Sequence, residues 1–407
     1  MPQFDLIVFG ATSFVGEILC QYLVKEYGVD GDVKWAAAGR SQSKLEKLRA
    51  SLGKTAEQLT LLTADAADEV ALKTLCDQTK VIISTVGPYA LYGEPLVKVC
   101  VETGTDYCDL TGEVQWVKRM ITRYQGQAQE SGARIVHCCG FDSIPSDMGV
   151  WHLQQQAQQQ FGAAATDIRM RVKAMRGAAS GGTIASMINI TKEAAKSKEL
   201  RKELANPYSI CPANHSFKGR QRNVTAPEFD KESNQWAGPF IMAGINTRVV
   251  HRSNALSGNA YGDKFLYDES VLMGKGAKGR MTAGGFVLGI GVFLAGAAIK
   301  PTRWVMENYM LPKPGEGPSP KAQEKGFYDI RFIGETEKGD VIKTKVTGDR
   351  DPGYGSTSKM LAQAGLSLAF DVSNEEKGGG FWTTATVFDQ RFVDRLTSKA
   401  GIGFEVL

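Results

Sequence analysis

The N-terminal third of the chain alternates short apolar runs with stretches in which apolar residues recur at helical spacing. A β-favouring run from Phe4 to Phe9 ends at Gly10, and an amphipathic helix is predicted over Phe14–Glu26. Further strands are predicted at Val33–Ala38, Leu59–Thr63, Val81–Ser84, Asp106–Cys108 and Arg134–His137, with helices at Lys44–Leu52, Ala67–Cys76, Pro95–Thr103 and Glu113–Ser131. Strands that alternate with helices form parallel sheets with right-handed crossovers. Residues 1–140 therefore predict an α/β, Rossmann-type doubly wound parallel sheet that binds a dinucleotide.

The pattern changes after Gly140, where Asp142–Pro145 favours a turn. Strands predicted at Ile168–Val172, Phe240–Val250 and Phe327–Ile333 mix with helices, which indicates a second, α+β substrate domain over residues 141–350. Thr357–Phe370 has a helical pattern, and the C-terminal segment 351–407 is expected to return toward the first domain.

Composition and charge narrow the class of protein. The 407 residues suffice for two domains with ordinary cores. Lys and Arg number 48 against 44 Asp and Glu, and they are scattered, so nucleic-acid binding is not expected. The seven cysteines are odd in number and form no C-x-x-C pair, which favours a reducing compartment and no metal site. The first residues lack the pattern of a signal peptide, so we expect a cytoplasmic protein.

A glycine-rich turn separates the first predicted strand from the first predicted helix. It comprises Gly10, Ala11, Thr12, Ser13, Phe14, Val15 and Gly16. Gly10 permits a sharp turn and Gly16 permits close packing, while free N–H groups of Ala11 to Val15 are expected to hold a pyrophosphate at the helix N-terminus. Ser13 stands where the usual fingerprint has its middle glycine, and its small side chain still lets a phosphate approach. A purely structural strand–helix turn is the alternative.

The end of the second predicted strand distinguishes NAD from NADP. An acidic residue there would bind the ribose 2′-hydroxyl of NAD, whereas a cation accommodates the 2′-phosphate of NADP. Arg40 follows that strand, with Ser41 and Lys44 close behind it, and no carboxylate occupies the strand end. We therefore expect NADP as the cofactor, the alternative being an arginine on a solvated loop.

Two later loops complete the predicted nucleotide site. Asp65 follows the third strand and is expected either to border the adenine or to cap the next helix. Thr85, Val86, Gly87 and Pro88 follow the fourth strand and are expected to line the nicotinamide, because ligands lie at the carboxyl ends of parallel strands.

Several motifs along the chain resemble those of one enzyme family. Besides Gly10–Gly16, Ala38–Ser41 and Val86–Tyr89, they are Gly93, Tyr107–Glu113, Gly140–Asp147, Gly181–Thr183, Asn246–Val250, Pro314–Pro318 and Asp351–Gly355. In this order they resemble the saccharopine dehydrogenase-like oxidoreductases, and among these the branch of trans-acting enoyl reductases. Ser13 in place of a glycine is the departure from the pattern.

The resemblance implies an NADPH-dependent reductase of a carbon–carbon double bond in a lipid or polyketide acyl group, often carried by a separate synthase, as in glycolipid biosynthesis. Imine reduction of the saccharopine dehydrogenase type is an alternative that predicts a polar, arginine-lined pocket. Arg248 and Arg252 would then hold carboxylates, unless they form a solvated face of the predicted strand. A noncatalytic, lipid-associated nucleotide-binding protein is the third alternative, and a homodimer is left open.

Hydride transfer needs a proton donor and a group that polarises the acceptor. Tyr89, on the predicted nicotinamide loop, and Asp142, after the sixth strand, are the catalytic candidates. Their alternatives are aromatic packing for Tyr89 and turn formation for Asp142. Asp109 and Glu113 also follow the fifth strand, but Thr111 and Glu113 have the pattern of a helix start, so we expect capping rather than catalysis there. For His137 we expect a place in the core.

Nineteen uncharged residues, Met281 to Ile299, nearly suffice to cross a bilayer. Five glycines reduce their hydrophobicity, and a span would interrupt the second domain, so we favour a helix that is buried or lies at a membrane surface. The expected location is the cytoplasm, with peripheral contact at the inner face of the plasma membrane.

Overall fold

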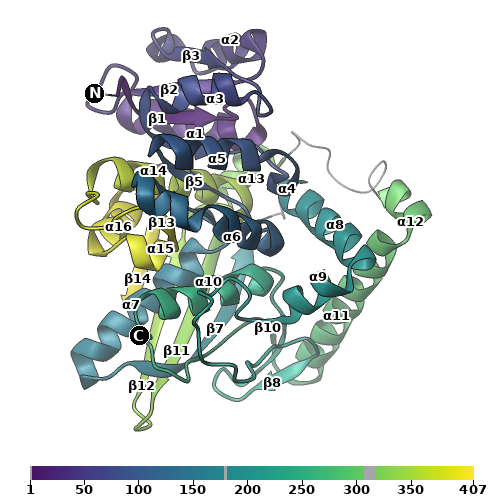
Figure 1. Cartoon of the computed structure of the whole chain (residues 1–407). Helices are drawn as coiled ribbons and strands as arrows, with labels where there is room; N and C mark the ends of the chain where they lie inside the picture. The colour runs from purple at the N-terminus through teal and green to yellow at the C-terminus, as the bar shows by residue number, and fades with distance from the viewer. Residues whose placement is uncertain (1, 178–180, 307–316) are drawn as a thin grey trace. The chain divides into compact units, whose positions relative to one another are not determined.

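The computed structural model describes residues 2–177, 181–306 and 317–407. These residues form two compact units, and Figure 1 labels their helices and strands where there is room. The first unit contains residues 2–144, 317–319 and 353–401, and the second contains 145–177, 181–306, 320–352 and 402–407. Of the motifs above, Gly181–Thr183 lies at the edge of one gap, and Pro314–Glu316 lies outside the described residues.

The first unit is built on a seven-stranded sheet in which every pair of neighbouring strands is parallel. Its order is β13 (Gly380–Trp382), β6 (Arg134–Val136), β5 (Asp106–Asp109), β4 (Thr79–Ser84), β1 (Phe4–Phe9), β2 (Trp35–Gly39) and β3 (Thr60–Thr63). The order 3-2-1-4-5-6 of the first six strands is that of doubly wound dinucleotide-binding folds, so the predicted fold class is confirmed.

The helices of this unit follow the predicted alternation. They are α1 (Phe14–Tyr27), α2 (Gln42–Ser51), α3 (Glu69–Cys76), α4 (Tyr89–Tyr92), α5 (Glu94–Thr103), α6 (Val114–Ser131), α14 (Thr357–Phe370), α15 (Thr384–Val387) and α16 (Gln390–Arg395). The central strand β1 is buried along its whole length, as its apolar sequence requires. Helix α14 has the predicted bounds and packs on α1, β1, β4 and β5.

A buried ion pair ties β5, β6 and the end of α14 together. Arg134 contacts the Asp106 carboxylate with two side-chain nitrogens, and its backbone N–H donates to the same carboxylate at 2.8 Å. Its guanidinium also donates to the carbonyl oxygens of Leu368, at 2.8 Å, and Val372, at 2.5 Å. Both charges are buried, so removing either side chain would leave the other charge without a partner and destabilise the fold.

The second unit is built on a mixed sheet of seven strands. Its order is β14 (Ile402–Val406), β12 (Val341–Gly348), β11 (Phe327–Thr336), β7 (Ala165–Arg176), β10 (Leu266–Gly274), β9 (Gln235–Pro239) and β8 (Glu228–Asp230). Its helices are α7 (Ile144–Phe161), α8 (Gly181–Lys196), α9 (Lys198–Ala205), α10 (Ala243–Leu256), α11 (Gly276–Ala298), α12 (Lys300–Val305) and α13 (Pro320–Glu324). Strands β7 and β10 run parallel and the other neighbours antiparallel, as in an α+β domain.

The strand predicted at Phe240–Val250 is wrong, because β9 ends at Pro239 and helix α10 begins at Ala243. The β-branched residues of this segment favour a strand by propensity. Every residue from Arg248 to Asn254 is buried, however, so this helix is enclosed on all sides by the rest of its unit. Tertiary packing therefore outweighs local propensity here.

The apolar stretch predicted at Met281–Ile299 forms most of one continuous helix, α11. Among the described residues, it is the one helix long and apolar enough to cross a membrane. Only 11% of its most apolar 18-residue segment is buried. The hypothesis of a buried helix is therefore wrong for the described residues. Its contacts with β9, β10, α8 and α12 cover one side and leave the rest of its apolar surface exposed.

Replacing Arg134 by Met should leave the Asp106 carboxylate buried without its counter-charge. We expect a loss of about 3–5 kcal/mol in the free energy of unfolding, measured by urea denaturation. The matched control is Lys73→Met, which breaks the exposed pair with Asp77 and should cost less than about 1 kcal/mol. Equal losses for the two variants would contradict the structural role of Arg134.

Candidate functional site

The crevice at the carboxyl ends of β1 and β4 is where the strand order of the first unit reverses. β1 pairs with β2 on one side and with β4 on the other, so the loops after β1 and β4 part at this point. The hydroxyl of Thr85, after β4, lies 2.9 Å from the carbonyl oxygen of Gly10 and 2.9 Å from the Ser13 hydroxyl. The two predicted cofactor loops are thereby joined.

The two glycines of the turn are required by the space available. Gly10 has a φ of +86°, which a residue with a side chain rarely adopts. A Cβ on Gly16 would lie 2.3 Å from the carbonyl oxygen of Gly10. Helix α1 therefore starts directly against the end of β1, as close packing in this turn requires.

Ser13 has a role that the sequence did not reveal. It is the N-cap of α1, and its hydroxyl accepts a hydrogen bond from the N–H of Gly16 at 3.0 Å. The prediction that all N–H groups from Ala11 to Val15 are free is wrong in part, because Ala11 donates to Ala38 and Ser13 to Gly10. Within the described residues, those of Thr12, Phe14 and Val15 have no partner.

Two exposed cations follow β2. Neither Arg40 nor Lys44 makes an ion pair with any residue that the structure describes. Ser41 is the N-cap of α2, and its hydroxyl contacts that of Ser43 rather than the helix N–H groups. Charge and hydroxyl donors are therefore available beside the end of β2.

Asp65 lies exposed after β3 and accepts a hydrogen bond from the N–H of Ala67 at 2.9 Å. The alternative that Asp65 caps the following helix is wrong, because Asp68 is the N-cap of α3 and accepts from Val70 and Ala71. That Asp65 borders the adenine of the cofactor remains a prediction.

These features fit a dinucleotide with a 2′-phosphate. Unpartnered N–H groups at the start of a helix attract a pyrophosphate, and the glycines let it approach the backbone. Arg40 and Lys44 supply positive charge at the strand end where the ribose of a dinucleotide lies. Val86, Gly87 and Pro88 continue the loop after β4, on the side expected for the nicotinamide.

Tyr89 begins α4 and is buried. Its hydroxyl donates to the carbonyl oxygen of Ser84 at 2.9 Å, and its ring lies 5.3 Å from that of Trp116. The carboxylate of Glu113 accepts from the N–H groups of Tyr89 at 2.8 Å and Ala90 at 3.1 Å. Glu113 occupies the N-cap position of α6, as expected, but its side chain makes no capping hydrogen bond there. The carboxylate instead holds the start of α4.

A buried polar cluster follows β5 and β6. The Asp109 carboxylate accepts from the Tyr107 hydroxyl at 3.0 Å and from the N–H of Thr111 at 3.0 Å, and it lies 2.7 Å from Nδ1 of His137. His137 is accordingly a core residue. Burial first, and then the charge of Asp109, raise the pKa of Asp142 from its ordinary value of 3.8 to about 7. A carboxyl group with such a pKa can donate a proton near neutral pH.

The segment before α14 and the first turn of that helix reach the nucleotide crevice, a role that the sequence analysis does not predict. The ring of Tyr354 meets that of Phe14 edge to face at 4.8 Å. The hydroxyl of Thr357 accepts from the N–H of Phe141, and that of Ser358 donates to the carbonyl oxygen of Val15 at 3.4 Å. The one signal was the motif Asp351–Gly355, which carried part of the family resemblance.

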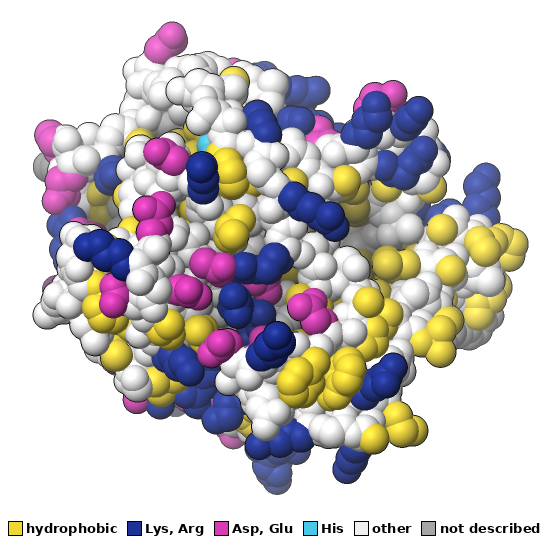
Figure 2. All heavy atoms as spheres, turned by 90° about the horizontal axis from the view of Figure 1, so that it is seen from below, with side chains coloured by type: hydrophobic (Ala, Val, Ile, Leu, Met, Phe, Trp, Pro, Cys, Tyr) yellow, Lys and Arg dark blue, Asp and Glu magenta, His cyan; other side chains and the backbone are white. Residues whose placement is uncertain are grey.

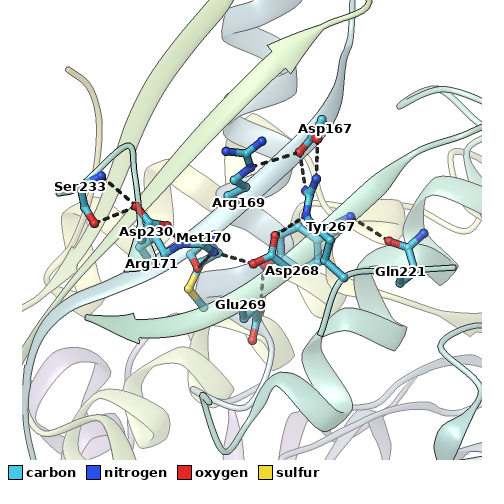
Figure 3. A network of polar contacts seen from close by, with 11 residues as sticks. Asp167, Arg169, Met170, Arg171, Gln221, Asp230, Ser233, Tyr267, Asp268 and Glu269 are labelled. Carbon is cyan, nitrogen blue, oxygen red and sulfur yellow. Dashed lines mark hydrogen bonds and ion pairs between the residues drawn. The ribbon is translucent and has the colours of Figure 1, made fainter. Parts of the chain in front are cut away.

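The second unit contains a polar network around β10, drawn in Figure 3. Arg171 donates to Asp230 at 2.5 Å and to Asp268 at 2.7 Å, and Arg222 also binds Asp268, at 2.9 Å. Next along β10, buried Glu269 accepts from Tyr267 at 2.7 Å and from Asn246 at 3.0 Å. Burial raises the pKa of Glu269 to about 7 despite these hydrogen bonds.

Arg248 and Arg252 lie on helix α10 and are buried, so a solvated strand face is wrong for both. Arg248 lines a cavity of about 430 Å³ in the second unit. Its other lining residues are Ala205–Tyr208, Lys218–Asn223, Ala243, Gly244, Thr247, Tyr267 and Glu269. The second unit thus contains a polar, arginine-lined pocket.

Comparisons with known proteins agree with this architecture. Residues 6–136 match the family described as the saccharopine dehydrogenase NADP binding domain. A solved structure of apo saccharopine dehydrogenase (L-Glu forming) from Saccharomyces cerevisiae covers 99% of this chain and 100% of its own, with 10% identity and a TM-score of 0.54, which shows the shared fold.

Curated relatives are similar over nearly the whole chain. A Mycobacterium tuberculosis protein, provisionally named a trans-acting enoyl reductase, is 37% identical over 99% of this chain and 97% of its own length. The trans-acting enoyl reductase of Mycobacterium bovis is 35% identical over 97% of this chain and 96% of its own. The chain therefore belongs to the saccharopine dehydrogenase-like oxidoreductases, in the branch of the trans-acting enoyl reductases, and is an NADP-dependent oxidoreductase.

Proposed function

We propose that this protein reduces a carbon–carbon double bond of a lipid or polyketide acyl group that a separate synthase carries. The observation that carries the proposal is the 34–37% identity to trans-acting enoyl reductases over 97–99% of the chain, which includes the crevice between β1 and β4. Such a reaction belongs to lipid or glycolipid biosynthesis.

NADPH supplies the hydride in this reaction, and the protein binds and orients both reactants. The N–H groups at the start of α1 bind the pyrophosphate, while Arg40, Ser41 and Lys44 bind the 2′-phosphate. The loop Thr85–Pro88 positions the nicotinamide. Reduction of an enoyl thioester also requires a proton, delivered to the carbon next to the carbonyl group.

Asp142 is the stronger of the two candidate proton donors. Its raised pKa keeps part of the carboxyl protonated at neutral pH, and the protonated carboxyl is the form that can donate a proton. Tyr89 is the second candidate, but its hydroxyl would first have to leave the carbonyl oxygen of Ser84. Burial raises the pKa of Tyr89 well above its ordinary value, which makes the phenol a weaker acid.

Imine reduction of the saccharopine dehydrogenase type is the second candidate function. The arginine-lined cavity of the second unit favours it, since an amino-acid substrate needs cations for its carboxylates. Turnover separates the two functions: one requires an enoyl thioester, and the other a keto acid with an amine. A protein that binds NADPH but turns over neither would be the noncatalytic alternative.

We also propose that α11 and α12 contact the surface of an anionic membrane from the cytoplasmic side. Met281, Leu288 and Val292 are 77%, 69% and 65% exposed, which is unusual for large apolar side chains on one helix. Figure 2 shows hydrophobic side chains gathered on the right, where Figure 1 places these helices, with Lys and Arg beside them.

Charge favours an anionic lipid surface for this contact. The sequence from Ser270 to Met306 contains five cations and no Asp or Glu. The cations are Lys275, Lys278, Arg280, Lys300 and Arg303, and they flank the apolar stretch at both ends. Each is worth about 1 kcal/mol near anionic headgroups. A peripheral location at the inner face of the plasma membrane and a homodimer remain predictions, the latter testable by analytical ultracentrifugation.

Arg40→Ala should weaken the binding of NADPH about ten- to a hundredfold and leave that of NADH nearly unchanged, because only NADPH carries the 2′-phosphate. Isothermal titration calorimetry measures both. The matched control is Lys47→Ala, which removes an exposed cation from α2 and should change neither affinity. Equal losses for both cofactors would refute the assignment of Arg40.

Asp142→Asn should reduce kcat and remove an inflection near pH 7, because the protonated carboxyl is the form that donates. The rate of the unchanged enzyme should fall as the pH rises through this value. Because burial raises the pKa of Asp142 on folding, the unfolded chain releases this proton at a lower pH than the folded protein does. The free energy of unfolding of the unchanged protein should therefore fall as the pH rises from 3.8 to about 7, and Asp142→Asn should remove that part of the decrease. A variant that keeps the inflection would exclude Asp142 as the donor.

Leu288→Asp combined with Val292→Asp should lower binding to vesicles of phosphatidylglycerol and phosphatidylcholine by about tenfold or more, since two exposed apolar contacts are lost. Co-sedimentation measures the bound fraction. The control is Val70→Asp, which alters a side chain 79% exposed on α3. Vesicle binding that is unchanged in the double variant, or absent from the start, would reject the membrane contact.

A further inference from the structure

The cavity of the second unit is formed by four separate pieces of chain. The end of α9, the loop Lys218–Asn223, and the neighbouring elements α10 and β10 supply its walls. Its volume of about 430 Å³ is within the range of small-molecule sites. Four of its lining side chains are cationic, and Glu269 supplies the one carboxyl group.

Positive charge prevails in this cavity. Arg222 is neutralised by Asp167 and Asp268, but Lys218 and Arg220 are exposed and make no ion pair within the described residues. The carboxyl of Glu269 is only partly ionised at neutral pH, since burial raises its pKa to about 7. An anion that enters the cavity therefore meets more positive than negative charge.

Arg248 is the exceptional group of the cavity wall. It is 8% exposed, and its terminal nitrogens donate to backbone carbonyl oxygens of Gly244 and Leu204. Its Nε has no partner, and no carboxylate contacts the guanidinium in the part of the chain that the structure describes. Burial without a counter-ion lowers the pKa of Arg248 to about 10. A buried cation without an anion is costly, and a bound anion would offset that cost.

The uncompensated positive charge of Arg248 also acts on a neighbouring histidine. Burial first, and then nearby positive charge that includes Arg248, lower the pKa of His251, on the same helix, to about 3. His215 and His251 both pack on Tyr208, which lines the cavity, at 5.0 and 5.1 Å between ring centroids. The surroundings thus contain aromatic surface and imidazoles that stay neutral, without a counter-charge for Arg248.

We propose that this cavity binds the phosphate ester of a small organic molecule, with Arg248, Arg220 and Lys218 around the phosphate oxygens. Arg and Lys side chains on different segments suit a phosphate, whose oxygens point in several directions. The volume leaves room for the organic part beside Pro207 and Tyr208. If the proposed function holds, the ester is the 4′-phosphopantetheine arm by which a synthase carries its acyl group.

Calorimetry of the full-length protein with 4′-phosphopantetheine tests this site without turnover. The matched probe is pantetheine, which lacks only the phosphate. We expect binding of the phosphate ester that weakens as salt is added, at least tenfold weaker binding of pantetheine, and competition by millimolar inorganic phosphate. Equal binding of the two probes, or tighter binding of 2-oxoglutarate than of either, would overturn the proposal.

Variants identify the residues responsible. Arg248→Gln should weaken 4′-phosphopantetheine binding at least tenfold, and Arg248→Lys should restore part of it. Arg220→Gln alters an exposed side chain that cannot disturb the core, and should also weaken binding. Lys321→Gln, which removes an exposed charge of the second unit outside the cavity lining, is the control. Unchanged binding in both arginine variants would overturn the proposal.

NADPH affinity should be unchanged in all these variants, since the cofactor residues lie in the first unit. Binding of the phosphate ester by a protein that reduces no enoyl thioester would refute the proposed function and leave this site standing. Enoyl reduction without phosphate-dependent binding would support the proposed function and refute this site.

Discussion

The close approach of α1 to the end of β1 is the constraint on which the nucleotide crevice depends. A Cβ on Gly16 would collide with the carbonyl oxygen of Gly10, so the helix can start this near the strand only with glycine there. Ser13 then caps the helix and meets Thr85 from the loop after β4. The reversal of strand order between β1 and β4 opens the crevice at this point. Arg40 follows β2, the neighbour of β1 on the other side.

Buried arginines in this protein divide into two kinds. Arg134 and Arg171 each contact carboxylates, and they connect strands within the sheets of their own units. Arg248 is buried to a similar extent, but its guanidinium donates to backbone carbonyl oxygens. A structural arginine needs its counter-charge within the fold, whereas one that binds a ligand can receive its counter-charge from outside. This contrast distinguishes the cavity of the second unit from the networks around it.

Much of the first unit could be predicted from the sequence because apolar strands and amphipathic helices alternate there with short turns. The alternation located β1 to β6, and the helix over Thr357–Phe370 was found with its bounds. Ser13 could not be recognised as a cap, because a serine in a glycine-rich turn is equally suited to a nearby phosphate. The contact of Tyr354 with Phe14 joins residues 340 positions apart, which no local pattern reports.

The second unit was harder to predict because its sheet is mixed and its strands are distant in sequence. β-branched residues around Val249 favour a strand, and α10 is buried on every side from Arg248 to Asn254, so the segment lacks the exposed polar face that marks an amphipathic helix in a sequence. The apolar sequence of α11 suggests burial as readily as a membrane contact, since composition does not say what covers a helix. The environment of Arg248 depends on the carbonyl oxygens and loops that surround it in three dimensions.

The most direct test of the proposed function follows the hydride. The protein would be incubated with NADPH deuterated at C4 and an enoyl thioester on a phosphopantetheinylated carrier protein, and the acyl product analysed by mass spectrometry. The proposal predicts a saturated acyl group that carries one deuterium from the cofactor. An unchanged enoyl group, together with deuterium transfer to an amino acid when a keto acid and an amine are supplied, would contradict it in favour of imine reduction.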